Sequence, residues 1–357
     1  MNLSAFIVAL FVYFMLIVSV IRNQSRKVVI SNLFNIFIAI VLILSAAFRS
    51  ELVGSDTPDY IEDYEAMANM SLPTVVADYY LSVVYYGSSW IARRIGLPQW
   101  CWFGLVEALY IYSALVFVNK LSKNRLFAFF CFVSIGLFFP SYCIMKQIVA
   151  MSFAMLSYIA VVEKKNRRAV SLFILGFFSH QSIILFAFAY LIYFFRKKKQ
   201  LIYLLTAGFV LIAIVGGSIW SSIIGGYGNE HYMMYADSDE DYSSTAVIYM
   251  TVLLALAFII RGSYQRKNPI ECTLLISLSL FACVLQSLAS SFSIAHRLAY
   301  YYMPFMVLLI PNTIESMKNV SSRLFFQYLY FAMMSFFLIY TQRSIPYLLD
   351  VKVLSWF

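Results

Sequence analysis

Residues 28–64 read VVISNLFNIFIAIVLILSAAFRSELVGSDTPDYIEDY and change abruptly from apolar residues to a stretch rich in acidic residues. The part before Arg49 is free of charged residues and is long enough to cross the hydrocarbon core of a bilayer, which takes about 20 apolar residues. Arg49 follows at once, and six acidic residues then lie from Glu51 to Glu65. The stretch predicts a transmembrane helix that ends near Arg49 and leads into an acidic loop.

The whole chain shares this apolar character. Its 357 residues are 62% hydrophobic and 12% charged, with a mean hydropathy of +0.80, whereas soluble proteins carry about 25% charged residues. The formal net charge of +9 does not indicate a nucleic-acid partner. The basic residues lie in short clusters between apolar runs, as they do in cytoplasmic loops. The composition therefore predicts an integral membrane protein that binds no nucleic acid.

Apolar runs along the chain predict an all-α, polytopic transmembrane bundle with about ten full spans. We place these spans near residues 3–21, 28–48, 98–118, 125–141, 146–162, 201–220, 246–261, 271–293, 299–314 and 324–342. If the basic clusters between them face the cytoplasm, both termini face outward. Internal repeats and low-complexity linkers are not evident, so we expect residues 1–357 to form a single membrane domain.

Two outer loops follow from this layout, one over residues 49–97 and a second over 221–245. The end of the first loop, residues 74–97, is apolar but contains Asp78 and is rich in Tyr and Trp. A span there would also reverse the direction of every later loop. We therefore favour a helix lying in the outer interface over a membrane span.

The segment 169–195 also fails as an ordinary span, because a basic cluster lies at each of its ends. Both ends inside require an even number of crossings, but ~27 residues are too few for two full spans. We expect a re-entrant pair of short helices that turns near Ser179–His180–Gln181. Irregular backbone at membrane depth lies against protein or a water-filled cavity, so the segment predicts a polar cavity, open to the outside, with His180 at its floor.

The basic residues outside the cytoplasmic clusters are informative. Arg49 ends the second span, Lys146 opens the fifth, and Arg297 lies beside His296 between two later spans. For any one of them, reaching toward lipid headgroups is the simpler explanation. Together with His180 they converge on one membrane face, where ionisable residues are functional by default. Several cations at an outer cavity fit a lipid pyrophosphate, whose oxygens Arg and Lys bind through charge-assisted hydrogen bonds.

The acidic loop supplies further candidates. Gly54 permits a sharp turn, and Thr57 is expected to be the N-cap of a helix. Asp56, just before it, is the best acidic candidate for orienting an acceptor hydroxyl or taking its proton. We expect no metal site, because the loop lacks a close Asp-x-Asp pair, and Glu107, alone in an apolar run, is expected to partner a basic residue. Three other acids are more simply a solvated helix face: Glu62, Asp63 and Glu65.

Arg49, Gly54, Asp56 and Tyr60 form a pattern of an arginine just outside a span, then G-x-D, then a tyrosine four residues on. This pattern resembles the EpsG-type, Wzy-like family of bacterial polymerases of O-antigen, capsule and exopolysaccharide. The resemblance extends over essentially the whole chain, although the matching motifs are sparse.

Further matches follow later in the chain. Lys146 and Gln147 open a span, His180 follows a short helix, and Tyr300 lies close behind Arg297. The chain departs from the family at Lys146, where arginine is common. A lysine keeps the charge but loses the bidentate fork of a guanidinium, which weakens the expected phosphate contact.

The resemblance implies a glycosyltransferase with a GT-C-like fold in the bacterial inner membrane, with its active site facing the periplasm or exterior. It implies transfer of a glycan from undecaprenyl pyrophosphate to another lipid-linked repeat unit, without a cofactor. The implied partners are undecaprenyl-pyrophosphate-linked oligosaccharides, membrane lipids and a chain-length regulator. Arg49, Lys146 and Arg297 would hold the pyrophosphate, and His180, or else His296 or Asp56, would activate the acceptor hydroxyl. The remaining implied substrate contacts are Gln147, Tyr60 and Tyr300.

Three rival functions stay open on the sequence alone. A flippase or transporter of lipid-linked oligosaccharide would also need a cationic cavity, but transporters usually carry an internal repeat with paired broken helices. An O-antigen ligase would use the same leaving group but usually has a large outer loop. A membrane acyltransferase is weaker, because His180 lacks an acyl-transfer motif around it.

Overall fold

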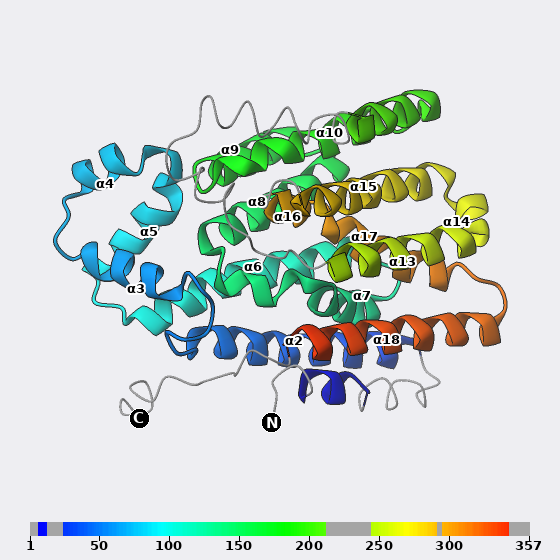
Figure 1. Cartoon of the computed structure of the whole chain (residues 1–357), viewed down its shortest axis with the longest axis horizontal. Coiled ribbons are helices and arrows are strands. Elements are labelled where there is room, and N and C mark those ends of the chain that lie inside the picture. The colour runs from blue at the N-terminus through cyan, green and yellow to red at the C-terminus, as the bar shows by residue number, and fades with distance from the viewer. Residues whose placement is uncertain (1–5, 13–23, 212–243, 291–294, 343–357) are drawn as a thin grey trace. The chain divides into compact units, whose positions relative to one another are not determined.

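The structure is a computed structural model that describes residues 6–12, 24–211, 244–290 and 295–342. Over these residues 85% of the chain is helix and none is strand, which confirms the prediction of an all-α protein (Figure 1). The predicted span 3–21 and outer loop 221–245 lie mostly outside the described residues.

The chain divides into two compact units, Met1–Ile184 with Ala332–Phe357 and Leu185–Phe331. The prediction of a single domain is not tested by this division and stays a prediction. The described elements of the first unit are α2 (Gln24–Ala47), α3 (Thr57–Ala66), α4 (Leu72–Asp78), η1 (Tyr80–Ser82), α5 (Val83–Arg94), α6 (Gln99–Leu121), α7 (Arg125–Phe132), η2 (Val133–Leu137), η3 (Phe139–Tyr142), α8 (Met145–Val162) and α9 (Asn166–Phe177).

The second unit is also helical. Its described elements are α10 (Ala187–Phe194), a helix over Lys199–Leu211, α13 (Ser244–Ile260), α14 (Gly262–Lys267), α15 (Pro269–Ser287), η5 (Leu288–Ser290), α16 (Ala295–Ala299) and α17 (Met303–Glu315). Two elements run from one unit into the other: η4 (Gln181–Phe186) and α18 (Val320–Gln342).

Five described helices are long and apolar enough to cross a membrane: Val28–Ala47, Gln99–Leu121, Met145–Val162, Pro269–Ser287 and Val320–Gln342. They coincide with five of the ten predicted spans. Shorter apolar helices lie in four other predicted spans: Arg125–Leu137, Lys199–Leu211, Thr245–Ile260 and Met303–Glu315. The helical bundle is thus confirmed, whereas the number of full spans stays a prediction.

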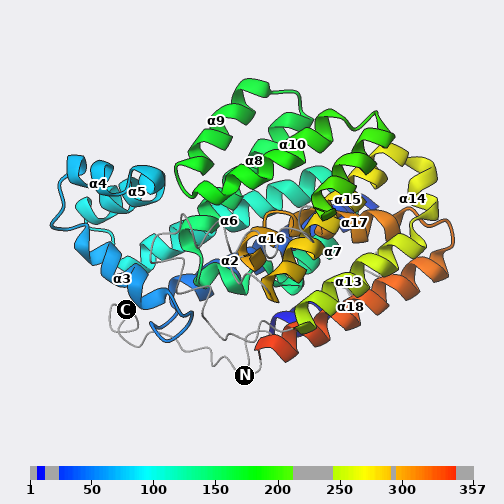
Figure 2. The ribbon, with the colours of Figure 1, turned by 45° about the horizontal axis from the view of Figure 1, so that its top comes forward.

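In the first unit, α2, α6, α8 and α9 form a row in which each helix packs on the next (Figure 1 and Figure 2). The inner helix α8 buries most of its length, whereas α2 exposes large apolar side chains such as Leu33 and Phe37. An outward apolar face of this kind suits contact with lipid, since the hydrocarbon core offers no polar partners. The row therefore has the burial pattern of a membrane bundle.

The predicted span 125–141 is shorter than expected. Helix α7 and the π-helical turn η2 end at Leu137, so this apolar helix is about 20 Å long, against about 30 Å of hydrocarbon. Gly136 lies at φ +96°, a left-handed conformation that interrupts the helix. Tyr110 OH donates to Leu137 O at 3.0 Å, so protein rather than water satisfies this backbone carbonyl. The irregular stretch that follows leads directly to the start of α8.

The segment predicted as one interfacial helix, 74–97, is instead two helices, α4 and α5, with a break at Tyr79–Ser82. The two helices pack on each other, and at the break Tyr79 stacks on Tyr86 of α5 with ring centroids 3.8 Å apart. Neither helix is long and apolar enough to be a candidate span. The location of the segment 74–97 in the outer interface of the membrane stays a prediction.

The segment predicted to be re-entrant, 169–195, breaks where expected. Helix α9 ends at Phe177 and the next helical turn begins at Gln181, on either side of Ser179 and His180. Helix α10 belongs to the second unit, so the pairing of the two helices across the membrane stays a prediction.

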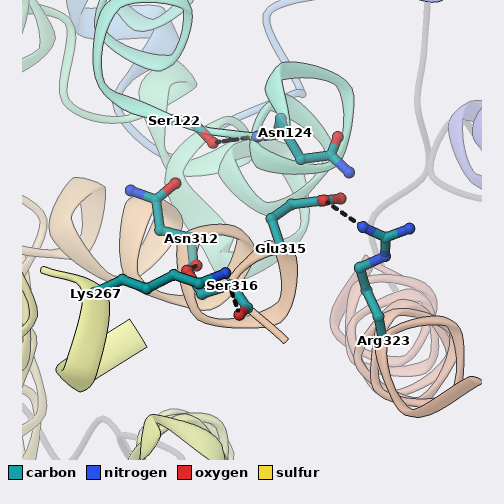
Figure 3. Close-up of polar contacts among 7 residues, drawn as sticks. All are labelled: Ser122, Asn124, Lys267, Asn312, Glu315, Ser316 and Arg323. Carbon is teal, nitrogen blue, oxygen red and sulfur yellow. Dashed lines mark hydrogen bonds and ion pairs between the residues drawn. The ribbon is translucent and has the colours of Figure 1, made fainter. Parts of the chain in front are cut away.

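In the second unit, α13, α15 and α17 pack on one another, and polar contacts hold the end of α17. Lys267 donates to Ser316 O at 3.0 Å, and Arg323 pairs with Glu315 at 3.4 Å; both contacts are drawn in Figure 3. The buried Asn312 lies one turn before Ser316. These contacts join α14, α17 and α18 at loops that the sequence predicts to be cytoplasmic.

Candidate functional site

Arg49 lies two residues beyond α2 and is almost fully buried, with 4% of its surface exposed. Its guanidinium donates to Ala46 O at 2.8 Å and to Thr57 Oγ1 at 3.3 Å. A third contact, 3.3 Å long, reaches Met145 Sδ at the start of α8. Arg49 therefore joins the end of α2, the start of α3 and the start of α8.

Aromatic rings complete the enclosure of Arg49. The ring centroids of Phe103 and Tyr142 lie 4.4 and 5.0 Å from its Cζ atom, within the range of cation–π attraction. Burial lowers the pKa of the Arg49 guanidinium, and the nearby Tyr142 and Glu107 oppose that shift. Because its nitrogens point at protein groups, Arg49 does not reach for lipid headgroups.

The turn after Arg49 is built on Gly54, whose φ is +91°. A Cβ atom there would lie 2.9 Å from Thr57 Oγ1 and 3.0 Å from Tyr142 Cβ, so a larger residue would be both strained and crowded. Thr57 Oγ1 donates to Val53 O at 2.7 Å. The prediction of Thr57 as N-cap is therefore wrong: its hydroxyl closes the turn, and Asp56 is the N-cap residue.

Lys146 lies in the first turn of α8 and is half-buried. Its Nζ donates to the hydroxyl oxygen of Tyr86 at 3.1 Å, and the Tyr86 hydroxyl donates to Asp63 Oδ2 at 2.7 Å. This Lys146 chain, defined as Lys146, Tyr86 and Asp63, joins α8, α5 and α3. Asp63 is thus half-buried and hydrogen-bonded, which corrects its assignment to a solvated helix face.

Tyr86 is held in place from several sides. It is 4% exposed, it stacks on Tyr79, and it meets Tyr85 edge-on at a centroid distance of 5.2 Å. Burial, together with the hydrogen bond to Asp63, raises the pKa of Tyr86 well above its usual range. The phenol therefore keeps its proton, donates it to Asp63 and offers its lone pairs to Lys146.

Tyr60 and Gln147 also lie at the start of α8. Tyr60 is buried, and its hydroxyl donates to Cys143 O at 3.3 Å, two residues before the helix begins. Gln147 is buried in the first turn. The structure thus brings together four predicted substrate contacts in this unit: Arg49, Lys146, Gln147 and Tyr60.

Asp56 and His180, two predicted catalytic residues, are half-buried with partners close in sequence. Ser55 Oγ donates to Asp56 Oδ1 at 2.6 Å, and His180 Nδ1 lies 2.6 Å from Ser182 Oγ. The turn that carries His180 is tied to α5 by the backbone hydrogen bond from Val84 N to Phe178 O, at 2.9 Å. Helix α5 thus connects the His180 turn with the Lys146 chain.

Glu107 is buried in α6, and its charge acts on Arg49. Its Oε1 atom lacks a hydrogen-bond partner among the described residues. The expectation that Glu107 partners a basic residue is in line with this neighbour, although the two make no ion pair within the described chain.

His296, Arg297 and Tyr300 lie in and just after α16 in the second unit, and all three are half-buried. The rings of His296 and Tyr300 meet edge-on at a centroid distance of 5.8 Å. The convergence of these residues with Lys146 stays a prediction.

The sequence analysis did not identify Tyr86 as a candidate, and it assigned Asp63 to a solvated helix face. The one available signal was the tyrosine-rich stretch VVYYGSSW over 83–90. The hydrogen bonds of the Lys146 chain join residues 23 and 60 positions apart, so sequence spacing does not reveal them.

Helix α8 brings its own field to this site. Ile144, at the N-cap, makes no side-chain capping bond, and the first turn holds no acid. The N-terminus of a helix is a positive end that favours anions. With Lys146 in the first turn and Arg49 against Met145, the start of α8 is suited to an anionic group.

The described helices and this cation-rich helix start define a polytopic, all-α membrane protein. A family model described as the EpsG family matches residues 32–349. The chain therefore belongs to the EpsG family, a polysaccharide polymerase-like family. Neither the curated proteins nor the solved structures contain a significant match to the chain.

Proposed function

We propose that the chain is a glycosyltransferase that lengthens an O-antigen, capsule or exopolysaccharide. Donor and acceptor are undecaprenyl-pyrophosphate-linked oligosaccharides at the outer face of the bacterial inner membrane. The enzyme that binds them has a GT-C-like fold. The acceptor hydroxyl loses its proton and bonds to the anomeric carbon of the donor, and the pyrophosphate lipid leaves with the electrons of the broken bond. Membership of the EpsG family supports the polymerase part of this proposal.

The observation that carries the proposal is the start of α8. A lysine in the first turn opposes the helix dipole, at a cost of about 0.3–1 kcal/mol, and acids are favoured there instead. Lys146 nevertheless lies at that position, with the buried Arg49 against the neighbouring Met145. A pyrophosphate would reverse the cost, because it meets the backbone N–H groups, the ammonium and the guanidinium charge together.

In this proposal Lys146 contacts the pyrophosphate. Arg49 acts through its charge and by holding Met145, since its nitrogens already donate to protein groups. The positive charge of the site grows in importance as the leaving group gains negative charge. Tyr60 and Gln147 shape the entrance to the first turn of α8.

His180 is the proposed base for the acceptor hydroxyl, with Asp56 and His296 as alternatives. Arg297 and Tyr300 are retained as contacts to the pyrophosphate or the glycan. Single alanine substitutions at these five positions test each assignment.

The test is a gel of surface polysaccharide from a strain that lacks the protein. We expect the polymer ladder to collapse to a single repeat unit and to return with the wild-type protein, but not with Lys146→Ala or His180→Ala at equal protein levels. Lys120→Ala, an exposed lysine paired with Glu163, is the matched control and should restore the ladder. Loss of all surface glycan in the deletion would instead indicate a flippase.

A further inference from the structure

We propose that Tyr86 and Asp63 are positioning residues for Lys146: Tyr86 holds the ammonium at the start of α8, and Asp63 fixes the direction of the Tyr86 hydroxyl. The inference rests on the proposed function, because it assigns Lys146 to the leaving pyrophosphate. It concerns two residues that touch Lys146 or each other rather than the reacting atoms.

The first step is the freedom of the lysine side chain. A lysine has four carbons and about 2 kcal/mol of rotamer entropy, and its ammonium is a point charge without a fixed fork. The positive end of α8 also repels that ammonium. The 3.1 Å bond to Tyr86 therefore selects one direction for a group that would otherwise turn away.

The second step is the direction of the Tyr86 proton. An ammonium only donates, so the Tyr86 oxygen must accept from Lys146 and send its own proton elsewhere. Asp63 Oδ2 takes that proton at 2.7 Å. A carboxylate is a stronger acceptor than a neutral group, so Asp63 keeps the Tyr86 lone pairs facing Lys146.

The third step is the rigidity of Tyr86 itself. Its ring is buried and stacked on Tyr79, with the rings 24° from parallel. A ring locked by packing carries its hydroxyl to a defined point, as the supporting residues of a binding site must. Substitution by phenylalanine keeps this ring and removes only the oxygen, which isolates the proposed role.

The test uses the full-length protein in lipid nanodiscs, with undecaprenyl pyrophosphate and undecaprenyl phosphate as probes. We expect Tyr86→Phe and Asp63→Asn to weaken the binding of undecaprenyl pyrophosphate on the order of 10-fold. In either variant the Lys146 ammonium is no longer held in place, and a displaced ammonium loses much of its attraction for the pyrophosphate. Binding of the monophosphate should change far less, because it lacks the second phosphoryl group. The matched control is Tyr64→Phe. Tyr64 is a buried tyrosine on the same helix as Asp63, and its substitution removes a hydrogen bond from its hydroxyl to Leu97 O.

A double-mutant cycle separates positioning from packing. If Tyr86 acts through Lys146, Tyr86→Phe adds no further loss of pyrophosphate affinity in a Lys146→Ala background. Additive losses, or a Tyr86→Phe protein that binds like wild type, would overturn the proposal. The proposed function has its own readout: a wild-type protein that fails to restore the ladder refutes the polymerase, whereas the cycle judges the positioning alone.

Discussion

Arg49 and Lys146 both lie at the start of α8, but their surroundings differ. Arg49 is enclosed by Phe103 and Tyr142 and donates to backbone and side-chain groups of α2 and α3. We call this enclosure, with the Gly54 turn, the Arg49 junction. Lys146 is half-buried, and its ammonium donates a hydrogen bond to the Tyr86 hydroxyl. The comparison teaches how differently the fold holds two neighbouring cations: Arg49 stabilises the fold, whereas Lys146 is proposed to contact a ligand. Substitutions at Arg49, Gly54 and Lys146 test this difference.

The largest expected effect is on stability in Arg49→Ala. The change leaves Ala46 O and Thr57 Oγ1 without their donor and opens a void beside Phe103, so we expect the free energy of unfolding to fall by about 3 kcal/mol. Thermal unfolding of the purified protein measures it. Arg94→Ala, an exposed arginine bonded to Met70 O, is the control. If both variants unfold alike while Arg49→Ala alone loses the polymer, Arg49 contacts substrate directly.

A somewhat smaller loss of stability is expected in Gly54→Ala. The new Cβ combines a left-handed backbone with contacts of 2.9 and 3.0 Å, so we expect about 2 kcal/mol of destabilisation. Gly87→Ala is the matched control, because Gly87 lies inside α5 with its nearest contact at 4.0 Å and should gain stability on substitution. Equal stability of the two variants would mean that the Arg49 junction is not tightly packed.

At Lys146 we expect the reverse pattern. Lys146→Met removes a cation from a positive helix end, so the free energy of unfolding should change by less than about 1 kcal/mol. The polymer ladder should nevertheless be lost. The two measurements are thermal unfolding and the gel, on the same preparation of cells. A destabilisation as large as that of Arg49→Ala would contradict the difference between the two cations.

The smallest effect concerns Glu163, the C-cap residue of α8, at the opposite end of that helix from Lys146. Hydrogen bonds from Lys120 and Lys165, each 2.7 Å long, lower the pKa of Glu163 from 4.5 to about 2. Because the folded-state pKa is depressed, the contribution to stability is present above pH 4.5 and is lost as the pH falls toward 2. Thermal unfolding of wild type and Glu163→Gln should therefore differ slightly at pH 7 and converge in acid. A constant difference would show that the pairs do not matter.

Much of the fold was readable from local composition. The apolar runs located α2, α6, α8, α15 and α18, because a bilayer requires about 20 apolar residues wherever a helix crosses it. The break at Ser179 and His180 also followed from the one polar triplet in an apolar segment. The sequence further singled out Arg49 and Lys146, since charged residues at membrane depth are rare.

Two features depended on packing instead. Thr57 was expected to cap α3, but Val53 O and Arg49 are nearer partners for its hydroxyl. The span 125–141 was expected to be complete, but Gly136 ends it early, with Tyr110 covering the open carbonyl of Leu137. Each outcome turned on which group from another element lay within hydrogen-bond distance.

Apolar length and the positions of charges can be read directly along the chain, and they were enough to predict the class of protein, its helices and the importance of two of its cations. They were not enough to predict the roles of those cations. Lys146 met Tyr86, and Tyr86 met Asp63, only because α3, α5 and α8 pack side chains 23 and 60 positions apart against one another. Arg49 likewise became enclosed by Phe103, Tyr142 and Met145, which all lie more than 50 positions away in the sequence. Hydrogen bonds act over about 3 Å, so partners distant in sequence become known only when the helices are placed.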